Sequence, residues 1–131
     1  MTRSTHEESL EAGMAMRRQV LGDAHVERSL RNATDFARPM QELVTEYCWG
    51  EVWTRPGLPP KTRSLLNLAM LTALGKQHEL GLHVRGAVNN GCSTEEIQEA
   101  LLQTAIYCGV PAALEAFRTA EQVLADLESN A

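Results

Sequence analysis

The chain has 131 residues, a net charge of −5, 44% hydrophobic residues and 5% aromatic residues. This length suits one compact domain, so we expect residues 1–131 to form a single domain. The acidic balance and the absence of a basic stripe argue against a nucleic-acid partner. No apolar run has the length of a signal peptide core or of a membrane span, which predicts a cytoplasmic protein without membrane contact.

The three cysteines, Cys48, Cys92 and Cys108, do not form a recognisable motif. They are odd in number, contain no Cys-x-x-Cys, and have the spacing of neither a zinc site nor a disulfide framework. None has a neighbouring histidine, and no Gly-x-Ser-x-Gly elbow is present. We therefore expect reduced thiols, and the sequence gives no sign of a covalent nucleophile.

Helix signals recur along the chain and strand alternation does not, which predicts an all-α fold. We expect an amphipathic helix over residues 5–21 that stops at Gly22, a shorter helix around residues 26–33, and a third over residues 35–47. Residues 49–60 hold both tryptophans and several prolines. This composition indicates an ordered loop.

Residues 61–74 are apolar around most of a helical circumference, with Arg63 and Asn67 as polar exceptions. This pattern predicts a central helix that is covered on nearly all sides. The next helix follows Gly75 and ends at Asn90-Gly91, where glycine supplies a left-handed cap.

Two further helices complete the expected bundle. Ser93 and Glu96 have the spacing of a capping box, which opens a helix that stops at Gly109. Pro111 begins the last helix, because proline is tolerated in the first turn.

Residues 76–86 are the most informative stretch, because they hold two of the four histidines together with a carboxylate and a guanidinium. A helix brings residues three and four apart onto one face. One stripe then contains Glu79, His83, Gly86 and Asn90, and the stripe beside it contains His78, Leu82, Arg85 and Asn89. An acid, a base and an anion anchor would face one pocket.

A metal site is the first interpretation of this cluster to weigh. The zinc metalloprotease helix needs histidines four residues apart, whereas His78 and His83 are five apart and point about 140° away from each other. Glu79 and His83 would supply two ligands, but the sequence offers no obvious third ligand. We therefore expect no metal.

Two further interpretations of the cluster stay open. A Glu–His pair four residues apart is ordinary stabilisation of a helix surface. However, Glu79 and His83 border the apolar face formed by Leu80 and Val84, and partial burial beside a carboxylate tunes an imidazole for proton transfer. For Tyr107 and Arg63, a structural role is at least as well supported as a functional one.

Three blocks of sequence, at residues 63–71, 78–87 and 101–113, resemble the carboxymuconolactone decarboxylase family in order and separation. The resemblance extends from about residue 8 to residue 127. It implies a compact all-helical fold of the alkyl hydroperoxidase D type, assembled as a homotrimer or homohexamer. It also implies a place in the protocatechuate branch of the β-ketoadipate pathway of aromatic degradation.

The redox branch of that fold carries Cys-x-x-Cys-x-x-x-His, and alignment of its histidine on His83 puts Lys76 and Glu79 at the cysteine positions. Both cysteines are absent, which removes the disulfide chemistry and leaves an acid–base site. The reaction implied by the resemblance is loss of CO₂ from γ-carboxymuconolactone, 2-carboxy-5-oxo-2,5-dihydrofuran-2-acetate, to give β-ketoadipate enol-lactone.

This reaction requires no cofactor, because the lactone carbonyl accepts the electrons that the departing carboxylate leaves. We predict that His83 delivers the proton, that Glu79 orients it, and that His78 bonds the dienolate oxygen or a substrate carboxylate. Arg85 is the predicted anion anchor and Arg63 the second candidate. Tyr107 is a weaker candidate for the wall of the pocket.

Two different functions are also consistent with the sequence. One is that of a related all-α enzyme that acts on another lactone or a β-keto acid. The second is that of a non-catalytic helical oligomer in which the polar cluster is a salt-bridge network at a subunit interface.

Overall fold

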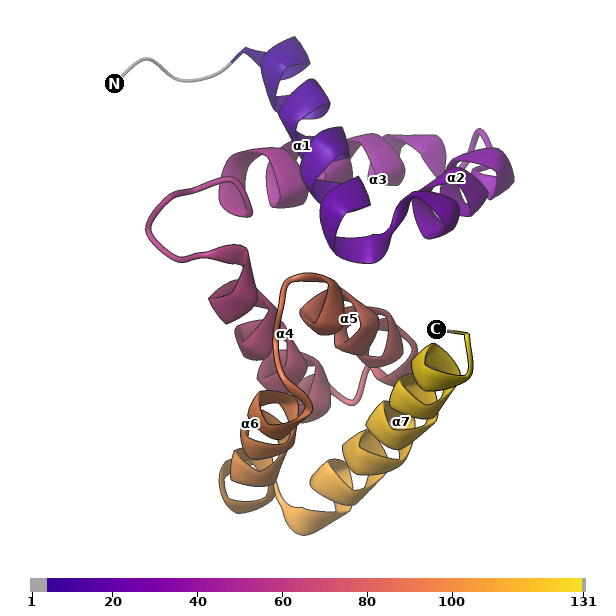
Figure 1. Cartoon of the computed structure of the whole chain (residues 1–131). Helices are drawn as coiled ribbons and strands as arrows, with labels where there is room; N and C mark the ends of the chain where they lie inside the picture. Colours follow the sequence, from indigo (N-terminus) through magenta and orange to yellow (C-terminus); the bar gives the residue numbers. More distant parts are fainter. Residues whose placement is uncertain (1–4, 131) are drawn as a thin grey trace. The chain divides into compact units, whose positions relative to one another are not determined.

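A computed structural model describes residues 5–130, and within this range the chain contains helices and no strands (Figure 1). The prediction of an all-α fold is confirmed. The elements are α1 (His6–Leu21), α2 (Asp23–Asn32), α3 (Arg38–Leu43), η1 (Val44–Val52), α4 (Pro60–Leu74), α5 (Gln77–Asn89), α6 (Thr94–Tyr107) and α7 (Val110–Ser129). They form two compact units, the amino-terminal unit Met1–Leu58 and the carboxy-terminal unit Pro59–Ala131.

The helix ends follow the predicted capping signals. Thr5 Oγ1 accepts a hydrogen bond from the Glu8 amide at 3.1 Å and caps α1. Ser93 and Glu96 form the reciprocal capping box of α6, with bonds of 2.9 and 3.0 Å. Gly75 ends α4 in the left-handed conformation, with φ of 69°. These local signals explain why the predicted bounds of most helices agree with the structure.

In the amino-terminal unit, α1 packs on η1 through two glycines. A Cβ atom on Gly13 would overlap with the carbonyl oxygen of Thr45, and one on Gly50 would overlap with the carbonyl oxygen of Ser9. The two backbones therefore approach more closely than any other residue would allow. At these two positions the contact is therefore made by backbone atoms.

The loop predicted for residues 49–60 is wrong at its start, because Trp49 and the three residues after it belong to η1. This element is a π-helix, as shown by the amide of Trp53, which donates to the carbonyl of Cys48 five residues earlier at 3.0 Å. The Trp49 and Trp53 rings pack with their centroids 4.9 Å apart. A π-helical register does not follow the 3.6-residue period that sequence patterns reveal.

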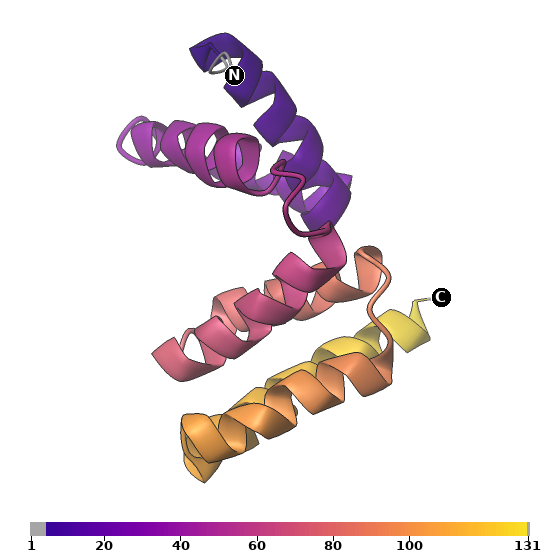
Figure 2. The same ribbon diagram turned by 90° about the vertical axis from the view of Figure 1, so that its left-hand side faces the viewer.

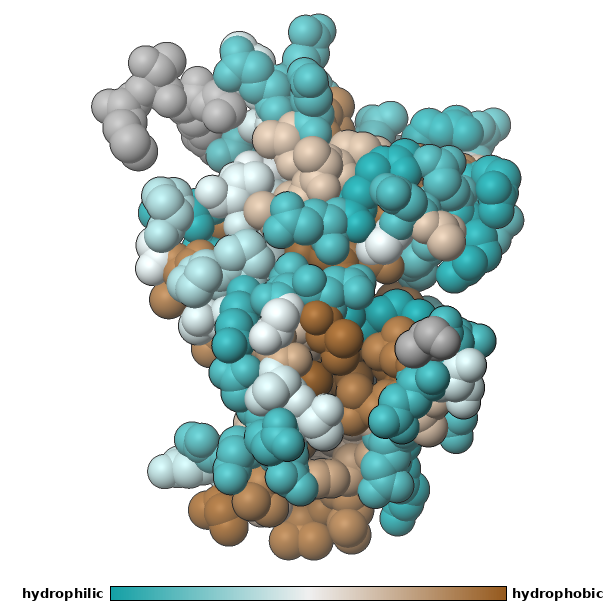
Figure 3. Space-filling view, viewed as in Figure 1, coloured by the Kyte–Doolittle hydropathy of each residue, from teal (hydrophilic) through white to brown (hydrophobic). Residues whose placement is uncertain are grey.

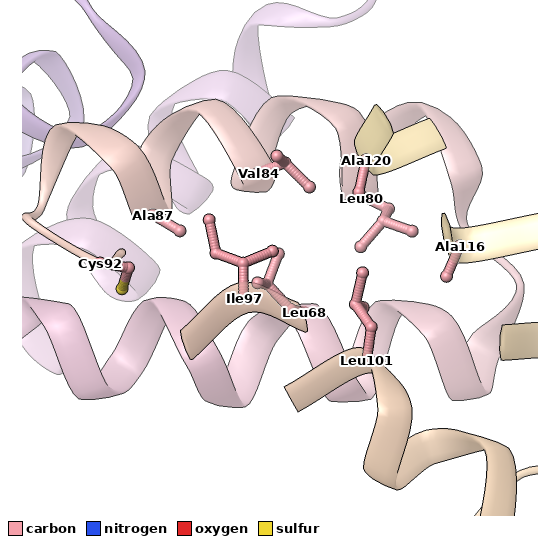
Figure 4. Close-up of a cluster of buried hydrophobic side chains, with 9 residues drawn as sticks. All are labelled: Leu68, Leu80, Val84, Ala87, Cys92, Ile97, Leu101, Ala116 and Ala120. Atoms are coloured by element: carbon pink, nitrogen blue, oxygen red, sulfur yellow. The ribbon is translucent and has the colours of Figure 1, made fainter. Parts of the chain in front are cut away.

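In the carboxy-terminal unit, α4, α5, α7 and α6 pack in this order around a bundle (Figures 1 and 2). All four helices and the α5–α6 turn contribute to one apolar core (Figure 4). Its buried members are Leu68, Leu80, Val84, Ala87, Cys92, Ile97, Leu101, Ala116 and Ala120. The core fixes the rotation of α5, and this rotation decides which of its polar residues face α4.

The predicted coverage of α4 on nearly all sides is wrong within the single chain. Leu66, Met70 and Leu74 are 46%, 53% and 68% exposed. Apolar residues of α6 and α7 are also exposed, and Figure 3 shows apolar surface at the end of the unit where α7 follows α6. We refer to these exposed residues together as the apolar face: Leu66, Met70, Leu74, Leu102, Ile106, Tyr107, Val110 and Leu114.

Across the described residues, none of the helices combines the length and the apolar character that a membrane span requires.

Candidate active site

The polar residues that the structure brings together lie where α5 packs on α4. Asn67 Nδ2 lies 3.4 Å from His83 Nδ1, in a half-buried contact between the two helices. About two turns further along α5, Asn90 Nδ2 donates to Ser64 Oγ at 2.9 Å. Ser64 is fully buried. Two side-chain contacts therefore hold one edge of α5 against α4.

The position of His83 follows from the core. Leu80, Val84 and Ala87 turn inward and are fully buried, so His83 lies at the border between the core and the surface. Its half-buried imidazole agrees with the border position expected from the sequence. The contact with Asn67 on the neighbouring helix limits the rotation of the ring.

Glu79 and His78 occupy the first turn of α5. Glu79 is exposed, and His78 lies beside it at the same end of the helix. The structure gives His83 a contact with Asn67, whereas the sequence suggested Glu79 as the residue that orients it. Glu79 lies one turn before His83 on the same stripe of α5. His78 and Glu79 therefore lie at the end of α5 near the site.

The two candidate anchors lie on different helices. Arg85 is half-buried on α5 and makes no ion pair with the residues that the structure describes. Arg63 is half-buried on α4, one turn before Asn67. Both guanidinium groups are thus carried by the helix pair that positions His83.

Tyr107 is not brought to this cluster. It is 82% exposed and borders a cavity of about 320 Å³ between α4 and α6. The α4 residues that line this cavity are Thr62, Leu65, Leu66 and Ala69. At about 100° per residue they lie on the face of α4 opposite to Ser64 and Asn67. Within one chain, Tyr107 and His83 therefore lie beside opposite faces of α4.

Asn67 is the residue whose role sequence reasoning did not identify. An amide in the middle of an apolar helix was a visible signal, because polar groups in such a position need partners. Its pairing with His83 depends on how α4 crosses α5, and the sequence does not specify that crossing.

We find no group of three or more His, Cys, Asp or Glu side chains placed to hold a metal ion within residues 5–130. The chemistry available at the α4–α5 contact is that of an imidazole, two guanidinium groups and amide and hydroxyl groups. The fold and the site together define an all-α bundle protein in which imidazole, guanidinium and amide groups gather along one helix–helix contact.

The chain belongs to the carboxymuconolactone decarboxylase family, whose family model matches residues 38–122. It is 48% identical to a nitrosuccinic acid decarboxylase of Metarhizium robertsii over 122 residues, which cover 93% of this chain and 85% of that protein. It is 45% identical to a 4-carboxymuconolactone decarboxylase of Acinetobacter baylyi over 121 residues, or 92% of this chain and 90% of that protein. A 4-carboxymuconolactone decarboxylase of Pseudomonas putida matches over 41 residues at 49% identity, 31% of this chain and 85% of that protein.

Proposed function

We propose that this protein decarboxylates 4-carboxymuconolactone, without a cofactor, to β-ketoadipate enol-lactone. The observation that carries the proposal is the 45% identity to the Acinetobacter baylyi enzyme over 92% of the chain. A match of this extent includes α4, α5 and α6, and therefore every candidate residue from Arg63 to Tyr107. The place of the reaction in protocatechuate degradation follows from its substrate.

The substrates named by the two long matches share one skeleton. Nitrosuccinic acid and 4-carboxymuconolactone are both substituted succinates: the carbon that bears the departing carboxylate also bears a CH₂–COO⁻ group. Each also carries an electron acceptor, a nitro group in one and a conjugated lactone carbonyl in the other. A site for this class must hold the retained carboxylate, accept negative charge on the acceptor and supply a proton.

His83 is the proposed proton donor. As a proton donor His83 is the imidazolium, with a proton on each ring nitrogen. Nδ1–H donates to the Asn67 side chain, whose amide then presents its oxygen, and Nε2 faces the substrate, so transfer of the Nε2 proton leaves a neutral imidazole. In 4-carboxymuconolactone the electrons of the broken C–C bond move through the ring double bond onto the carbonyl oxygen of the lactone. Cleavage of that bond releases one CO₂ per turnover, and protonation of the ring carbon beside the carbonyl then gives the enol-lactone. Asn67 acts as a positioning residue.

His78 and Glu79 have supporting roles in this proposal. His78 donates a hydrogen bond to the dienolate oxygen or to a substrate carboxylate. After turnover, Glu79 passes a proton from solvent to His83. Both lie in the first turn of α5, where the exposed Glu79 has room to turn toward a bound substrate.

Arg85 is the proposed anchor of the retained acetate group, and Arg63 is the second candidate. A cation beside the departing carboxylate would stabilise the ground state and slow the reaction. The anchor therefore holds the acetate, and the departing carboxylate lies in less polar surroundings. Tyr107 ends α6 and borders the cavity on the face of α4 opposite to Asn67. It therefore contributes to substrate binding at His83 only if it comes from another copy of the chain.

Nitrosuccinic acid is the second candidate substrate, favoured by the 48% identity to the Metarhizium robertsii protein. Loss of the carboxylate beside the nitro group gives a nitronate, which the same proton donor would protonate. A related lactone or a β-keto acid as substrate, or a non-catalytic oligomer, would also be compatible with the fold.

The test is direct turnover. Chelator-treated protein is incubated with freshly prepared 4-carboxymuconolactone or with nitrosuccinic acid, and the products and CO₂ are followed by NMR against a no-enzyme control. We expect metal-independent turnover with a higher kcat/KM for the lactone. The reverse preference would make the second candidate the function, and no turnover of either substrate by folded protein would contradict both.

Variants assign the roles. His83→Ala is expected to lower kcat about 100-fold or more with little change in KM. Arg85→Ala is expected mainly to raise KM. His6→Ala is the matched control, because His6 lies at the start of α1 and pairs with Glu46 at 2.7 Å. A His83→Ala protein with full kcat would contradict the assignment of the proton donor.

We also propose that copies of the chain assemble through the apolar face, which contains eight exposed large apolar residues on α4, α6 and α7. A homotrimer or homohexamer is the stoichiometry that the family resemblance implies. Ile106→Glu is expected to shift the mass in light scattering toward that of a monomer. Ala125→Glu, which adds the same charge at an exposed position of α7 outside this face, should leave the mass unchanged.

A further inference from the structure

Arg17 is a buried cation in the amino-terminal unit. It lies on α1 on the same stripe as Ser9 and Gly13, and only 5% of its surface is exposed. Its Nη1 donates a hydrogen bond to Thr45 Oγ1 at 3.2 Å. Its Nε is buried and has no hydrogen-bond acceptor among the described residues. Thr45 therefore occupies the guanidinium at Nη1, and the edge that contains Nε has no hydrogen-bond acceptor among the described residues.

The charge of Arg17 also lacks a counter-ion among the residues that the structure describes. Within residues 5–130 no carboxylate pairs with it. The neighbouring Arg18 shows the ordinary arrangement, since it pairs with Glu27 at 2.7 Å and with Asp23 at 3.5 Å. Buried charges are normally paired, because an unpaired charge loses its hydration without compensation. An unpaired buried arginine beside a paired, more exposed one calls for an anion that the described residues do not supply.

Cys48 is the titratable group that interacts electrostatically with Arg17, and it does not supply this anion. The residue reaches the surface, but burial of the thiol raises its pKa, and the opposing effect of Arg17 is smaller. The thiol therefore stays neutral near pH 7, while the guanidinium stays charged although burial lowers its pKa.

The segment that faces Arg17 is unusual as well. Thr45 and Cys48 both belong to η1. π-Helical segments are rare in proteins, and many of those that occur are at functional sites. The packing of Gly13 against the Thr45 backbone fixes η1 close to α1, one turn from Arg17. The hydroxyl of Thr45 thus holds Nη1 in place and leaves the edge formed by Nε and Nη2.

We propose that Arg17 is the anion-binding residue of a carboxylate site in the amino-terminal unit, and that its ligand is a small succinate-type dicarboxylate. The Nε–Nη2 edge matches a carboxylate, which it binds through two parallel hydrogen bonds. The choice of a succinate skeleton rests on the proposed function, because both candidate substrates contain it. The presence of an anion site rests on Arg17 itself.

The chain contains its own reporter for this site. Trp49 lies on η1, one turn beyond Thr45, and Trp53 directly follows η1. Titration of the full chain with succinate, followed by tryptophan fluorescence at constant ionic strength, therefore reports on the amino-terminal unit. We expect a saturable change with succinate and a weaker response to propionate. No saturable change in the wild-type protein would overturn the proposal.

Variants of adjacent arginines supply the matched comparison. Arg17→Met and Arg17→Lys are expected to weaken succinate binding by at least about tenfold, because neither retains the planar fork. Arg18→Met removes the same charge one residue away and is expected to change the dissociation constant by less than about twofold. Succinate binding by Arg17→Met with wild-type affinity would overturn the proposal.

Thermal melting separates a binding role from a structural one. Without ligand, Arg17→Met should melt no lower than wild type, since it removes an uncompensated charge. With succinate, wild type and Arg18→Met should gain melting temperature and both Arg17 variants should not. If Arg17→Met fails to fold, Arg17→Lys decides the matter: an unchanged succinate affinity would contradict the proposal.

The outcome is independent of turnover, because succinate carries no electron acceptor and is not decarboxylated by the proposed mechanism. Succinate binding that depends on Arg17, without turnover of either candidate substrate, would support the site and contradict the proposed function. Turnover without succinate binding would support the function and overturn the site.

Discussion

In the carboxy-terminal unit the helices meet through buried apolar side chains such as Leu68, Leu80 and Leu101, whereas in the amino-terminal unit α1 meets η1 through Gly13 and Gly50. The first contact excludes water from large side chains. The second brings two backbones together. The buried apolar side chains of that unit include Val20, Val26 and Trp49.

This difference has a physical consequence for each unit. Burial of apolar area tolerates moderate changes in shape, because side chains repack and keep most of the area buried. Close backbone contact has no such tolerance, since no rotamer change creates space between a backbone and a new methyl group. The amino-terminal unit should therefore respond most strongly to the addition of atoms, and the carboxy-terminal unit to their removal.

Gly13→Ala should have the largest effect. The new methyl group would overlap with the Thr45 carbonyl, and its separation from η1 is expected to cost about 4 kcal/mol of unfolding free energy. Urea unfolding followed by tryptophan fluorescence measures this loss in the amino-terminal unit. Gly57→Ala is the control, because a Cβ atom there meets nothing within 4 Å. Equal stability of the two variants would contradict the close approach.

Leu68→Ala should cost about 3 kcal/mol, because it leaves a cavity in a core that all four helices share. Hydrogen exchange of the α5 amides measures the loss in the carboxy-terminal unit. Leu66→Ala, at a position 46% exposed on the same helix, is expected to cost far less in the separated chain. Similar losses for the two variants would indicate that the core does not dominate this unit.

The helix caps allow a finer comparison between the units. Ser93→Ala removes the capping box of α6 and should cost about 1 kcal/mol. Thr5→Ala removes a single bond at the start of α1 and should cost less. Thermal denaturation of both variants checks the order. A larger loss for Thr5→Ala would show that the start of α1 matters more to its unit than one capping bond suggests.

The smallest expected effect is a pH dependence at Glu96. The Ser93 amide and Lys61 lower the pKa of this exposed carboxyl below its ordinary value of 4.5. A lowered pKa contributes stability above the ordinary value, and this contribution is lost as the pH falls through the pKa of the folded state. The melting temperatures of wild type and Glu96→Gln should differ near pH 7 and converge in acid. A difference that grew in acid would have the wrong sign.

Sequence patterns predicted the helices best where local signals end them. The Ser93–Glu96 spacing and the glycines at 75 and 91 act within a few residues, so no knowledge of the fold was needed. The π-helix was missed because its register has no sequence period of its own, and because tryptophan, glycine and proline together resemble a loop. The exposed apolar residues of α4 were predicted to be buried for a related reason: the pattern records that a face is apolar and not what covers it.

The candidate site was predictable to the level of a helix face. The sequence placed the stripe that contains His83 and Asn90 at the border of the apolar face of α5, and the structure adds that this stripe contacts α4. Its partners Asn67 and Ser64 depend on the crossing of two helices, which is set by many side chains at once. Arg17 illustrates the same limit, because only the structure reveals that an arginine in a charged helix is buried and lacks a counter-ion among the described residues.

The apolar face has one more consequence if a second copy of the chain covers it. Association then stabilises the folded state by mass action, so the melting temperature should rise with protein concentration over the range in which copies assemble. Dilution would weaken each chain without any change in its sequence or its solvent. The amount of this protein that a cell makes would itself help to determine the fraction of copies that is folded.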